Sequence, residues 1–583
     1  MARKDIAAAE AALHDQTNLL PKKQLIVVFM IMSLSLLVCF IDQNGIGVLL
    51  PSIARDLNAS SSISWAGTSA LIANTVFQVL YGRLSDLFGR KNILLSALVL
   101  LSLSDLAVGL SVNSTMLYVF RGLAGIANGG IISLTMMIVS DVVTLKDRGK
   151  YQGILGSMIG TGNAIGPLIA ASFQRTSASW RGLFYLLTPL IMLAALTSWK
   201  FLPTTMPKLN IKETVAKIDF LGLFLGSVSV ILLLIPISQG GHEETPWNSP
   251  LIIAMLTVGG ITFFCFLLCE WRYASLPMMP LGMFRDRSVG AMLAQSFLLG
   301  CSYYTNIYFL PLYFQNVRDK SPLVAACLQI PLVGAQSTSS FLSGLYMSYF
   351  NRYSELIWMG FALWTLGGGL LIMANDTINI GLVCFFLIIT GSGTGMTFQP
   401  TLVALQASLP KSQRAVVTSN RNFIRSSGGA VGLAVSSAIL ANVLKSSLPP
   451  HLANVASSTF AAPDLSTFSP TDRAIVKAAY TSASRAVFIW SAPCTGICFL
   501  LCALITDHGL QRKEEREAAV PAQLDQASAE STREPTAVHD DCEKGLNQEN
   551  FMVDANSPRG SNSKIDSSTG DTSRHSTTSE KSS

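Results

Sequence analysis

Three charged side chains interrupt stretches of the chain that are otherwise almost entirely apolar. They are Asp42, Asp105 and Arg121. A charge near the centre of a lipid bilayer costs about 3 kcal/mol or more, so a charge in such a position usually serves a function. Counted from the ends of the apolar runs at about 1.5 Å per residue, the three residues lie at one depth, roughly 10 Å from one end.

Opposite charges at one depth can neutralise each other inside a helix bundle. An acid that is released from such a pair, or is buried away from water, can take up a proton near neutral pH. We therefore expect Asp42 and Arg121 to form a proton-responsive site. A purely structural ion pair is the alternative.

A second set of residues lies in a polar break between two apolar runs, from Gly82 to Lys91. Glycine permits a tight turn, an acid can pair with a cation or a helix N-terminus across a bundle interface, and basic side chains bind the membrane surface. Such a loop can hold one conformation shut. We predict a conformational latch made of Gly82, Asp86, Gly89, Arg90 and Lys91.

Small residues recur along a later apolar run, at Gly153, Gly162, Gly166 and Pro167. Small side chains let helix backbones approach closely, and proline can bend a helix. We expect this run to give two moving halves of the protein a smooth contact. Glycine-rich packing without any bearing on transport is the alternative.

An aromatic and polar run follows at Tyr303, Tyr304, Asn306 and Tyr308. Such side chains can line a cavity and hold planar or cationic organic molecules by stacking and cation–π contact. Aromatic residues at the membrane interface are the alternative reading. The polar residues Gln43, Asn44 and Gln399, which lie in other apolar runs, complete the predicted cavity lining.

The elements that position these residues follow from composition. Half of the 583 residues are hydrophobic, only 13% are charged and the mean hydropathy is +0.44, whereas a soluble domain carries about 25% charged residues. A helix needs roughly 20 apolar residues to cross a bilayer. We place fourteen such helices near 25–49, 62–83, 92–112, 114–138, 151–173, 181–202, 219–237, 251–269, 289–313, 322–347, 355–374, 379–402, 422–443 and 485–506. The predicted class is an all-α integral membrane protein.

The orientation of these helices is predicted by two independent signals. Lys and Arg collect in loops that share one side with the N-terminus, which the positive-inside rule makes cytoplasmic. The main exception is a predicted loop of about 40 residues before the last helix, which is long enough to weaken the rule. The sequons at Asn58, Asn113 and Asn375 all fall in loops on the other side, where N-glycosylation occurs. Both termini are therefore expected in the cytoplasm.

The motifs resemble those of the major facilitator superfamily, in its fungal fourteen-spanner branch of drug:proton antiporters. Residues 82–91 match the pattern GxLxDxxGR[KR], and the run from Gly153 to Pro167 resembles the antiporter motif. Further similar segments are Ile41-Asp42-Gln43-Asn44, Arg121-Gly122-Leu123-Ala124-Gly125, Tyr308 to Gln315, Gln399-Pro400 and Asn422 to Arg425.

The resemblance implies a fold and an organisation. It implies two six-helix bundles, at 25–202 and 289–506, with two inserted helices in a linker at 203–288 and one central cavity that opens alternately to each side. Cytoplasmic tails at 1–24 and 507–583 would flank them, and the Ser/Thr-rich C-terminal tail should be disordered. In such a fold the helix of Asp105 is peripheral, which favours a structural or rim role for that residue.

The resemblance also implies a function. It favours export of small organic compounds, such as a drug, toxin or secondary metabolite, in exchange for protons. The alternative is a proton-coupled importer or vacuolar transporter of basic amino acids, which an acid-rich cavity would favour; a non-transporting sensor on the same fold is a further possibility.

Other classes lack their sequence signals. No GxxxxGK[ST] motif supports ATP-driven transport, and no histidine or carboxylate-rich site inside the apolar runs supports an enzyme, a metal centre or a cofactor. The expected partners are a small-molecule substrate, protons and the lipid bilayer, without nucleic acid. We expect a monomer in the cell membrane, with the vacuolar membrane as the alternative.

Overall fold

A computed structural model describes residues 21–59, 62–63, 65–174, 176–203, 219–239, 246–273, 279–409, 413–452, 469–507 and 509. These residues belong to one compact unit, Met1–Arg516. Most of both predicted tails lies outside them. Fourteen helices of 18 or more residues occur in the described part: α2 (Lys22–Asp56), α3 (Trp65–Phe88), α4 (Arg90–Gly109), α5 (Ser114–Val142), α6 (Leu145–Phe173), α7 (Arg181–Phe201), α9 (Phe220–Gln239), α10 (Pro250–Arg272), α11 (Arg287–Asn316), α13 (Ile330–Phe350), α14 (Ser354–Leu371), α15 (Ile380–Ser408), α16 (Arg414–Ser447) and α17 (Pro470–Leu501).

Eleven helices in the described residues are long and apolar enough to cross a membrane. The other three long helices, α3, α11 and α13, carry many small and polar side chains, and each of them contacts a helix of the opposite half of the chain or lines the space between the halves. Such helices meet less lipid, so their composition can be more polar. The all-helical membrane class is therefore confirmed.

Several predicted helix boundaries were wrong. The predicted helix 322–347 is divided at Leu328 and Gln329 into a short α12 (Pro322–Cys327) and α13. Helix α16 begins at Arg414 instead of 422, and α17 begins at Pro470 instead of 485. Ser469 caps α17 by accepting a bond from the Asp472 amide, and Pro470 occupies the first helical position, so this helix starts on polar residues that an apolar pattern misses.

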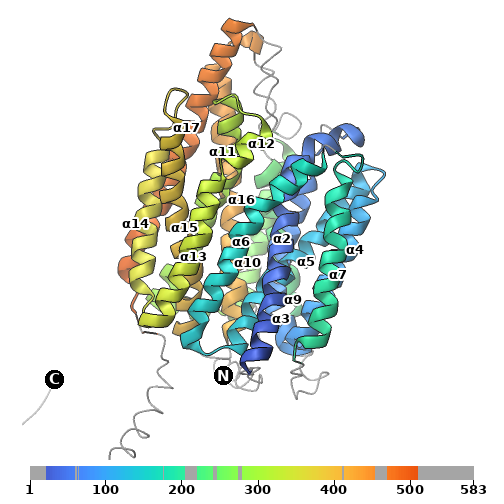
Figure 1. Ribbon diagram of the computed structural model, residues 1–583, viewed down its shortest axis with the longest axis vertical. Coiled ribbons are helices and arrows are strands. Elements are labelled where there is room, and N and C mark those ends of the chain that lie inside the picture. The colour runs from blue at the N-terminus through green and yellow to red at the C-terminus, as the bar shows by residue number, and fades with distance from the viewer. Residues whose placement is uncertain are drawn as a thin grey trace, which may run out of the picture. The chain divides into compact units, whose positions relative to one another are not determined.

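Helices α2 to α7 form one group, shown from blue to cyan-green in Figure 1. Their apolar residues share one core, in which Leu36, Leu101, Leu134 and Leu187 are fully buried. Helices α11 to α17 surround two further apolar cores. One core contains Phe361 and the other contains Phe314. Helices α9 and α10 pack on each other, and α9 also packs against α3 and α16 through a small apolar cluster.

The two helix groups meet mainly along two helix pairs. Helix α6 packs on α13, where a Cβ atom on Gly153 would lie 2.6 Å from the Ser340 carbonyl oxygen and 2.9 Å from Gly344 Cα. Helix α3 packs on α16, where a Cβ atom on Gly82 would lie 2.5 Å from Ser419 Oγ. Both contacts lie toward the end of the molecule at which α2 begins.

The three sequon asparagines lie in loops at the opposite end. Asn58 follows α2, Asn113 caps α5 after α4 ends, and Asn375 follows α14; all three are exposed. Helices α2, α4 and α14 run in the same direction, so their C-terminal ends share a face. At that end the Trp180 indole and Arg181 guanidinium donate to Asp56 at 3.0 and 2.6 Å, and these bonds lower the pKa of Asp56. The absolute orientation stays a prediction.

Candidate functional site

A buried ion pair joins α2 and α5 in the middle of the first helix group. Arg121 Nη1 lies 2.6 Å from Asp42 Oδ1, and the side chains are 1% and 0% exposed. The other carboxylate oxygen of Asp42 accepts a hydrogen bond of 2.8 Å from Asn128 Nδ2. The Arg121 guanidinium also lies 5.9 Å from the centroid of the Phe184 ring on α7. Both carboxylate oxygens of Asp42 therefore accept hydrogen bonds from donors on α5.

Asp105 of α4 lies beside this pair rather than at the rim. Its charged neighbours are Asp42 and Arg121. It is completely buried, and neither carboxyl oxygen has a hydrogen-bond partner in the described part of the chain. The tertiary structure therefore brings all three charged residues together and gives the two acids different surroundings.

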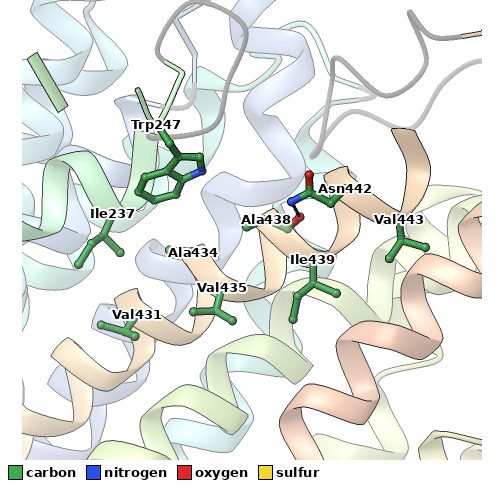
Figure 2. Close-up of a pocket in the computed structure, with 9 residues that line it drawn as sticks. All are labelled: Ile237, Trp247, Val431, Ala434, Val435, Ala438, Ile439, Asn442 and Val443. Atoms are coloured by element: carbon green, nitrogen blue, oxygen red, sulfur yellow. Dashed lines mark hydrogen bonds between the residues drawn. The ribbon is translucent and has the colours of Figure 1, made fainter. Parts of the chain in front are cut away.

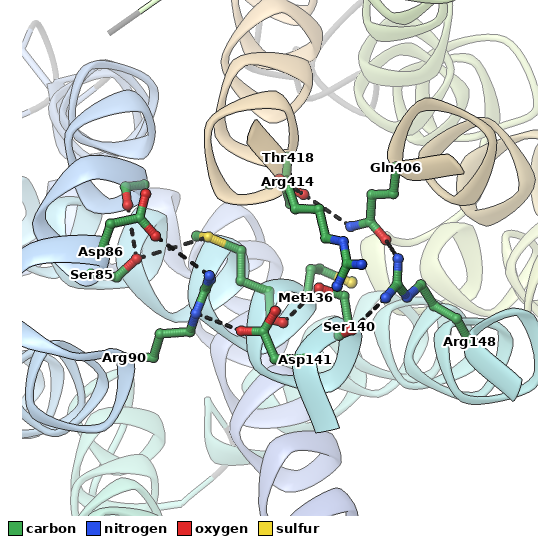
Figure 3. Close-up of polar contacts among 12 residues, drawn as sticks. Ser85, Asp86, Arg90, Met136, Ser140, Asp141, Arg148, Gln406, Arg414 and Thr418 are labelled. Atoms are coloured by element: carbon green, nitrogen blue, oxygen red, sulfur yellow. Dashed lines mark hydrogen bonds and ion pairs between the residues drawn. The ribbon is translucent and has the colours of Figure 1, made fainter. Parts of the chain in front are cut away.

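The predicted latch residues form a network inside the first helix group. Arg90 of α4 binds Asp141 of α5 at 2.5 Å and Asp86 of α3 at 3.4 Å, as Figure 3 shows. Gly89 has a φ of 83°, which suits glycine at the tight turn before α4. Lys91 donates to the carbonyl oxygen of Leu202 at the end of α7, at 2.7 Å, and so caps a helix instead of reaching the membrane surface as expected.

A contact that the sequence did not predict links the two helix groups at the same end. Arg148 of α6 donates to Gln406 of α15 at 3.3 Å and to the Ser140 carbonyl of α5 at 2.5 Å. Gln406 in turn donates to Thr418 of α16 at 2.9 Å (Figure 3). In the sequence Arg148 is one of three basic residues close together, with Lys146 and Lys150, and only the folded chain distinguishes it from them.

The glycines of α6 serve two different contacts. Gly153 lies against α13, across the interface between the helix groups. Gly162 and Gly166 lie against α2 within the first group, where added Cβ atoms would meet Phe40 and Ile41 at 2.7 and 3.0 to 3.1 Å. Pro167 lies inside α6, one residue beyond this contact. Of the predicted motif, only Gly153 is positioned for movement of one half against the other.

A methyl group at Gly153 should therefore hold the two halves apart. We expect Gly153→Ala to slow transport at least several-fold while membrane abundance stays normal, because the clash is with backbone atoms of α13 that cannot rotate away. Gly334→Ala on α13 is the matched control, since a Cβ atom there meets nothing within 4 Å. Initial transport rates divided by surface abundance measure the effect, and equal rates for the two variants would contradict it.

Several predicted cavity residues meet between the helix groups. Asn44 of α2 donates to Asn163 of α6 at 2.7 Å, and Asn163 donates to the Tyr303 hydroxyl of α11 at 2.7 Å. Tyr308, which is 41% exposed, lies near Arg121 of the opposite group. These contacts place one face of α11 toward the first helix group.

The four remaining predicted cavity residues lie in separate places within the two helix groups. Tyr304 packs on Gly429 of α16, where a Cβ atom would lie 2.3 Å from the ring. Gln399 of α15 is buried against Gly156 of α6. Asn306 is buried. Gln43 donates to the Cys39 sulfur at 3.3 Å and lies on the α5 side of α2.

Two arginines of α16 are the functional candidates that the sequence reasoning missed. Arg421 and Arg425 are 3% and 5% exposed. Because α16 begins at Arg414, they lie about 10 and 16 Å inside the helix, one turn apart on one face. The missed signal was this spacing of four residues, because the predicted helix begins at 422 and leaves out Arg421.

The two guanidinium groups differ in their contacts. Arg421 donates to the Phe398 carbonyl at 2.6 Å and to Thr401 Oγ1 at 3.2 Å. Arg425 lies 5.5 Å from the Phe398 ring centroid, its Nε is buried without a hydrogen-bond partner, and Tyr303 is a neighbour. In the described residues, neither arginine has a carboxylate within ion-pair distance. Arg425 therefore has donors available for a ligand.

Among its described residues, the second helix group carries no buried acid to balance these charges. Its acidic residues in the long helices, Glu355 and Asp472, lie in first turns at helix ends and are 49% and 28% exposed in their side chains. An unbalanced buried cation is costly unless an anion neutralises it. This half of the protein is thus electrostatically suited to an anionic ligand.

A separate cavity of about 590 Å³ lies along α16 and is lined by apolar side chains together with Asn442 (Figure 2). Ile237 of α9 and Trp247 form one wall, and residues 431–443 of α16 form the other. None of the predicted cavity residues, and neither arginine of α16, lines it. It is therefore distinct from the polar region between the helix groups.

The sequence matches known proteins along most of its length. A protein-family model described as Major Facilitator Superfamily matches residues 32–433. The chain is 47% identical to Citrate exporter 1 of Yarrowia lipolytica over 89% of this chain and 78% of that protein. It is 39% identical to the MFS-type transporter clz4 of Cochliobolus lunatus, over 90% and 96%. It is 31% identical to the efflux pump dotC of Dothistroma septosporum, over 73% of each chain.

The fold is also similar to solved structures. The human organic anion transporter MFSD10 matches with a TM-score of 0.55 and 14% identity over 83% of this chain and 100% of that chain. The proton:xylose symporter XylE matches with a TM-score of 0.55 and 15% identity over 85% and 99%. Together with the family match and the fungal relatives, the two-bundle helical fold shows that this chain is a multi-pass membrane transporter that belongs to the Major Facilitator Superfamily.

Proposed function

We propose that this chain exports small organic anions, with a tricarboxylate such as citrate as the preferred substrate, in exchange for protons by alternating access. The observation that carries the proposal is Arg425, a buried cation in the membrane with unused donors and no acidic partner in the described residues. Guanidinium groups bind carboxylates through two parallel hydrogen bonds. The similarity to a citrate exporter supports the same substrate class.

The charge distribution argues against the predicted alternative of basic amino acids. Arg425 and Arg421 would repel a cationic substrate, and the buried acids Asp42 and Asp105 lie on the other half of the chain, beside Arg121. Export of an anion also agrees with proton influx. Both movements carry charge in the same direction, so a negative-inside potential drives both by about 2.3 kcal/mol per charge for each 100 mV. We further propose that the protein works as a monomer in the cell membrane.

Export of larger aromatic compounds is the second candidate. Tyr308 is exposed between the helix groups, where it can stack on a planar molecule, and more distant relatives are efflux pumps. Such a substrate would still need an anionic group to neutralise Arg425. The sites at Asn58, Asn113 and Asn375 remain proposed glycosylation sites on the outer face.

A substrate panel tests the proposal. Purified full-length protein in liposomes is loaded in turn with radiolabelled citrate, succinate, arginine or a planar organic cation, and efflux is measured with an inward proton gradient. We expect efflux of citrate and, more slowly, of succinate, because Arg425 selects for carboxylates. Empty liposomes are the control. Faster efflux of arginine or the cation than of citrate would contradict the anionic substrate class.

A further inference from the structure

Asp105 is the one member of the buried charge cluster whose side chain has no hydrogen-bond partner in the described residues. It lies on α4, toward the end of the helix, and is completely buried. Both carboxyl oxygens lack a hydrogen-bond partner in the described residues. By contrast, Asp42 accepts bonds from Arg121 at 2.6 Å and from Asn128 at 2.8 Å. The same chemical group thus occurs twice in one cluster, once with donors and once without.

The charge balance of the cluster decides which form each acid takes. Two ionised carboxylates and one guanidinium would leave one net negative charge buried in the bilayer, at a cost of several kcal/mol. One bound proton makes the cluster neutral. Because hydrogen bonds from Arg121 and Asn128 stabilise ionised Asp42, the proton belongs on the acid that lacks donors.

The groups that face Asp105 from neighbouring helices agree with this assignment. Helix α2 contributes Asp42 and the Cys39 thiol, and α5 contributes Arg121. Helix α7 contributes Tyr185, whose hydroxyl donates to the Gly109 carbonyl at the end of α4. The titratable residues of α3, which are Tyr81, Arg83 and Asp86, lie nearer the other end of the bundle, about 12 to 20 Å from Asp105 along the helix axis. Among the described residues, Asp42 and Arg121 are therefore the charged groups that act on Asp105.

We propose that Asp105 is the residue that carries the coupled proton, while Asp42 and Arg121 form a lasting ion pair beside it. From the outer side, one proton binds the Asp105 carboxylate and gives a neutral carboxyl group. When the inner side opens, the O–H bond breaks, the proton leaves to the cytoplasm, and Arg121 faces two carboxylates. The proposal rests on the proposed proton exchange and moves the coupling site from Asp42 to Asp105.

Tyr308 connects this cluster to the second helix group. It belongs to α11, yet it lies near enough to Arg121 for the two to interact electrostatically. A change in the distance between Tyr308 and Arg121 would change the electrostatic surroundings of the cluster. The protonation of Asp105 is therefore linked to the relative position of the two halves.

An infrared measurement tests the protonation directly, without any substrate. Purified full-length protein at neutral pH should show the carbonyl band of a protonated carboxyl group in the difference between wild type and Asp105→Asn. Glu270→Gln is the matched control, because Glu270 is a buried acid of α10 outside the cluster and its removal should leave the Asp105 band in place. Absence of the Asp105 band from the wild-type protein would overturn the proposal.

A gradient measurement tests the coupling. In liposomes with fixed internal pH, the steady-state citrate gradient should change about tenfold per unit of external pH if one proton is exchanged, and Asp105→Asn should remove this dependence. Glu270→Gln should retain it. A tenfold response that persists in Asp105→Asn would overturn the proposal. If the wild type moves no citrate, the proposed substrate fails, and the infrared band still decides the role of Asp105.

Discussion

Arg425→Gln is expected to raise the KM for citrate by roughly 10- to 150-fold. A hydrogen bond to a charged group contributes about 1.5–3 kcal/mol, and the guanidinium of Arg425 has no acceptor in the described protein that would share its donors. Arg425→Lys keeps the charge and loses the paired geometry, so its KM should lie between those of wild type and Arg425→Gln. Efflux from liposomes as a function of internal citrate concentration gives these values.

The control for this prediction is the same substitution outside the polar region. Arg287 lies at the start of α11 and is exposed, so Arg287→Gln should keep the wild-type KM. Abundance and elution on size-exclusion chromatography show whether each variant is folded. An Arg425→Gln variant with wild-type KM would exclude Arg425 as the anion ligand and would leave the substrate class to be found elsewhere.

The double variant Asp42→Asn/Asp105→Asn is expected to lose most of its folded protein, whereas each single variant remains folded. In either single variant one carboxylate still neutralises Arg121. In the double variant Arg121, which is 1% exposed, has no acid to pair with, and an uncompensated buried charge costs about 3–5 kcal/mol. The melting temperature in detergent and the yield of monodisperse protein measure the loss.

A triple variant separates this electrostatic cause from poor packing. Adding Arg121→Gln to the double variant removes the unpaired charge and should recover much of the yield. If the effects of the two single substitutions simply added in the double variant, Asp42 and Asp105 would be energetically independent. That result would separate Asp105 from the ion pair and weaken its proposed role in coupling.

The sequence was most informative where the signal was local. Apolar runs of bilayer length predicted the membrane class and nearly every long helix, because lipid requires each crossing segment to be apolar and internally hydrogen-bonded. The stretch from Gly82 to Lys91 and the segments around Asp42 and Arg121 predicted the family. Each of these motifs consists of contiguous residues, so it can be read without knowledge of the fold. The family match confirms that prediction.

Prediction from apolar runs missed the polar first turns of some helices. Helix α16 begins on Arg414 and runs through Thr418, Ser419 and Asn420, all of which are buried against other helices. An apolar pattern cannot distinguish such a segment from a loop, because here burial is decided by neighbouring helices and not by lipid. This error moved Arg421 into a loop and hid its alignment with Arg425.

By itself, the sequence determined that the chain crosses the membrane many times, that it belongs to one transporter family, and that Asp42, Asp105 and Arg121 are functional candidates. Only the tertiary structure decided how these candidates differ. Within the part of the chain that the structure describes, it gave Asp42 two donors and Asp105 none, and it buried Arg425 without an acid beside it. The physical reason is that the charge state and ligand of a buried group depend on partners from other helices, and those partners are brought near only when the chain is folded.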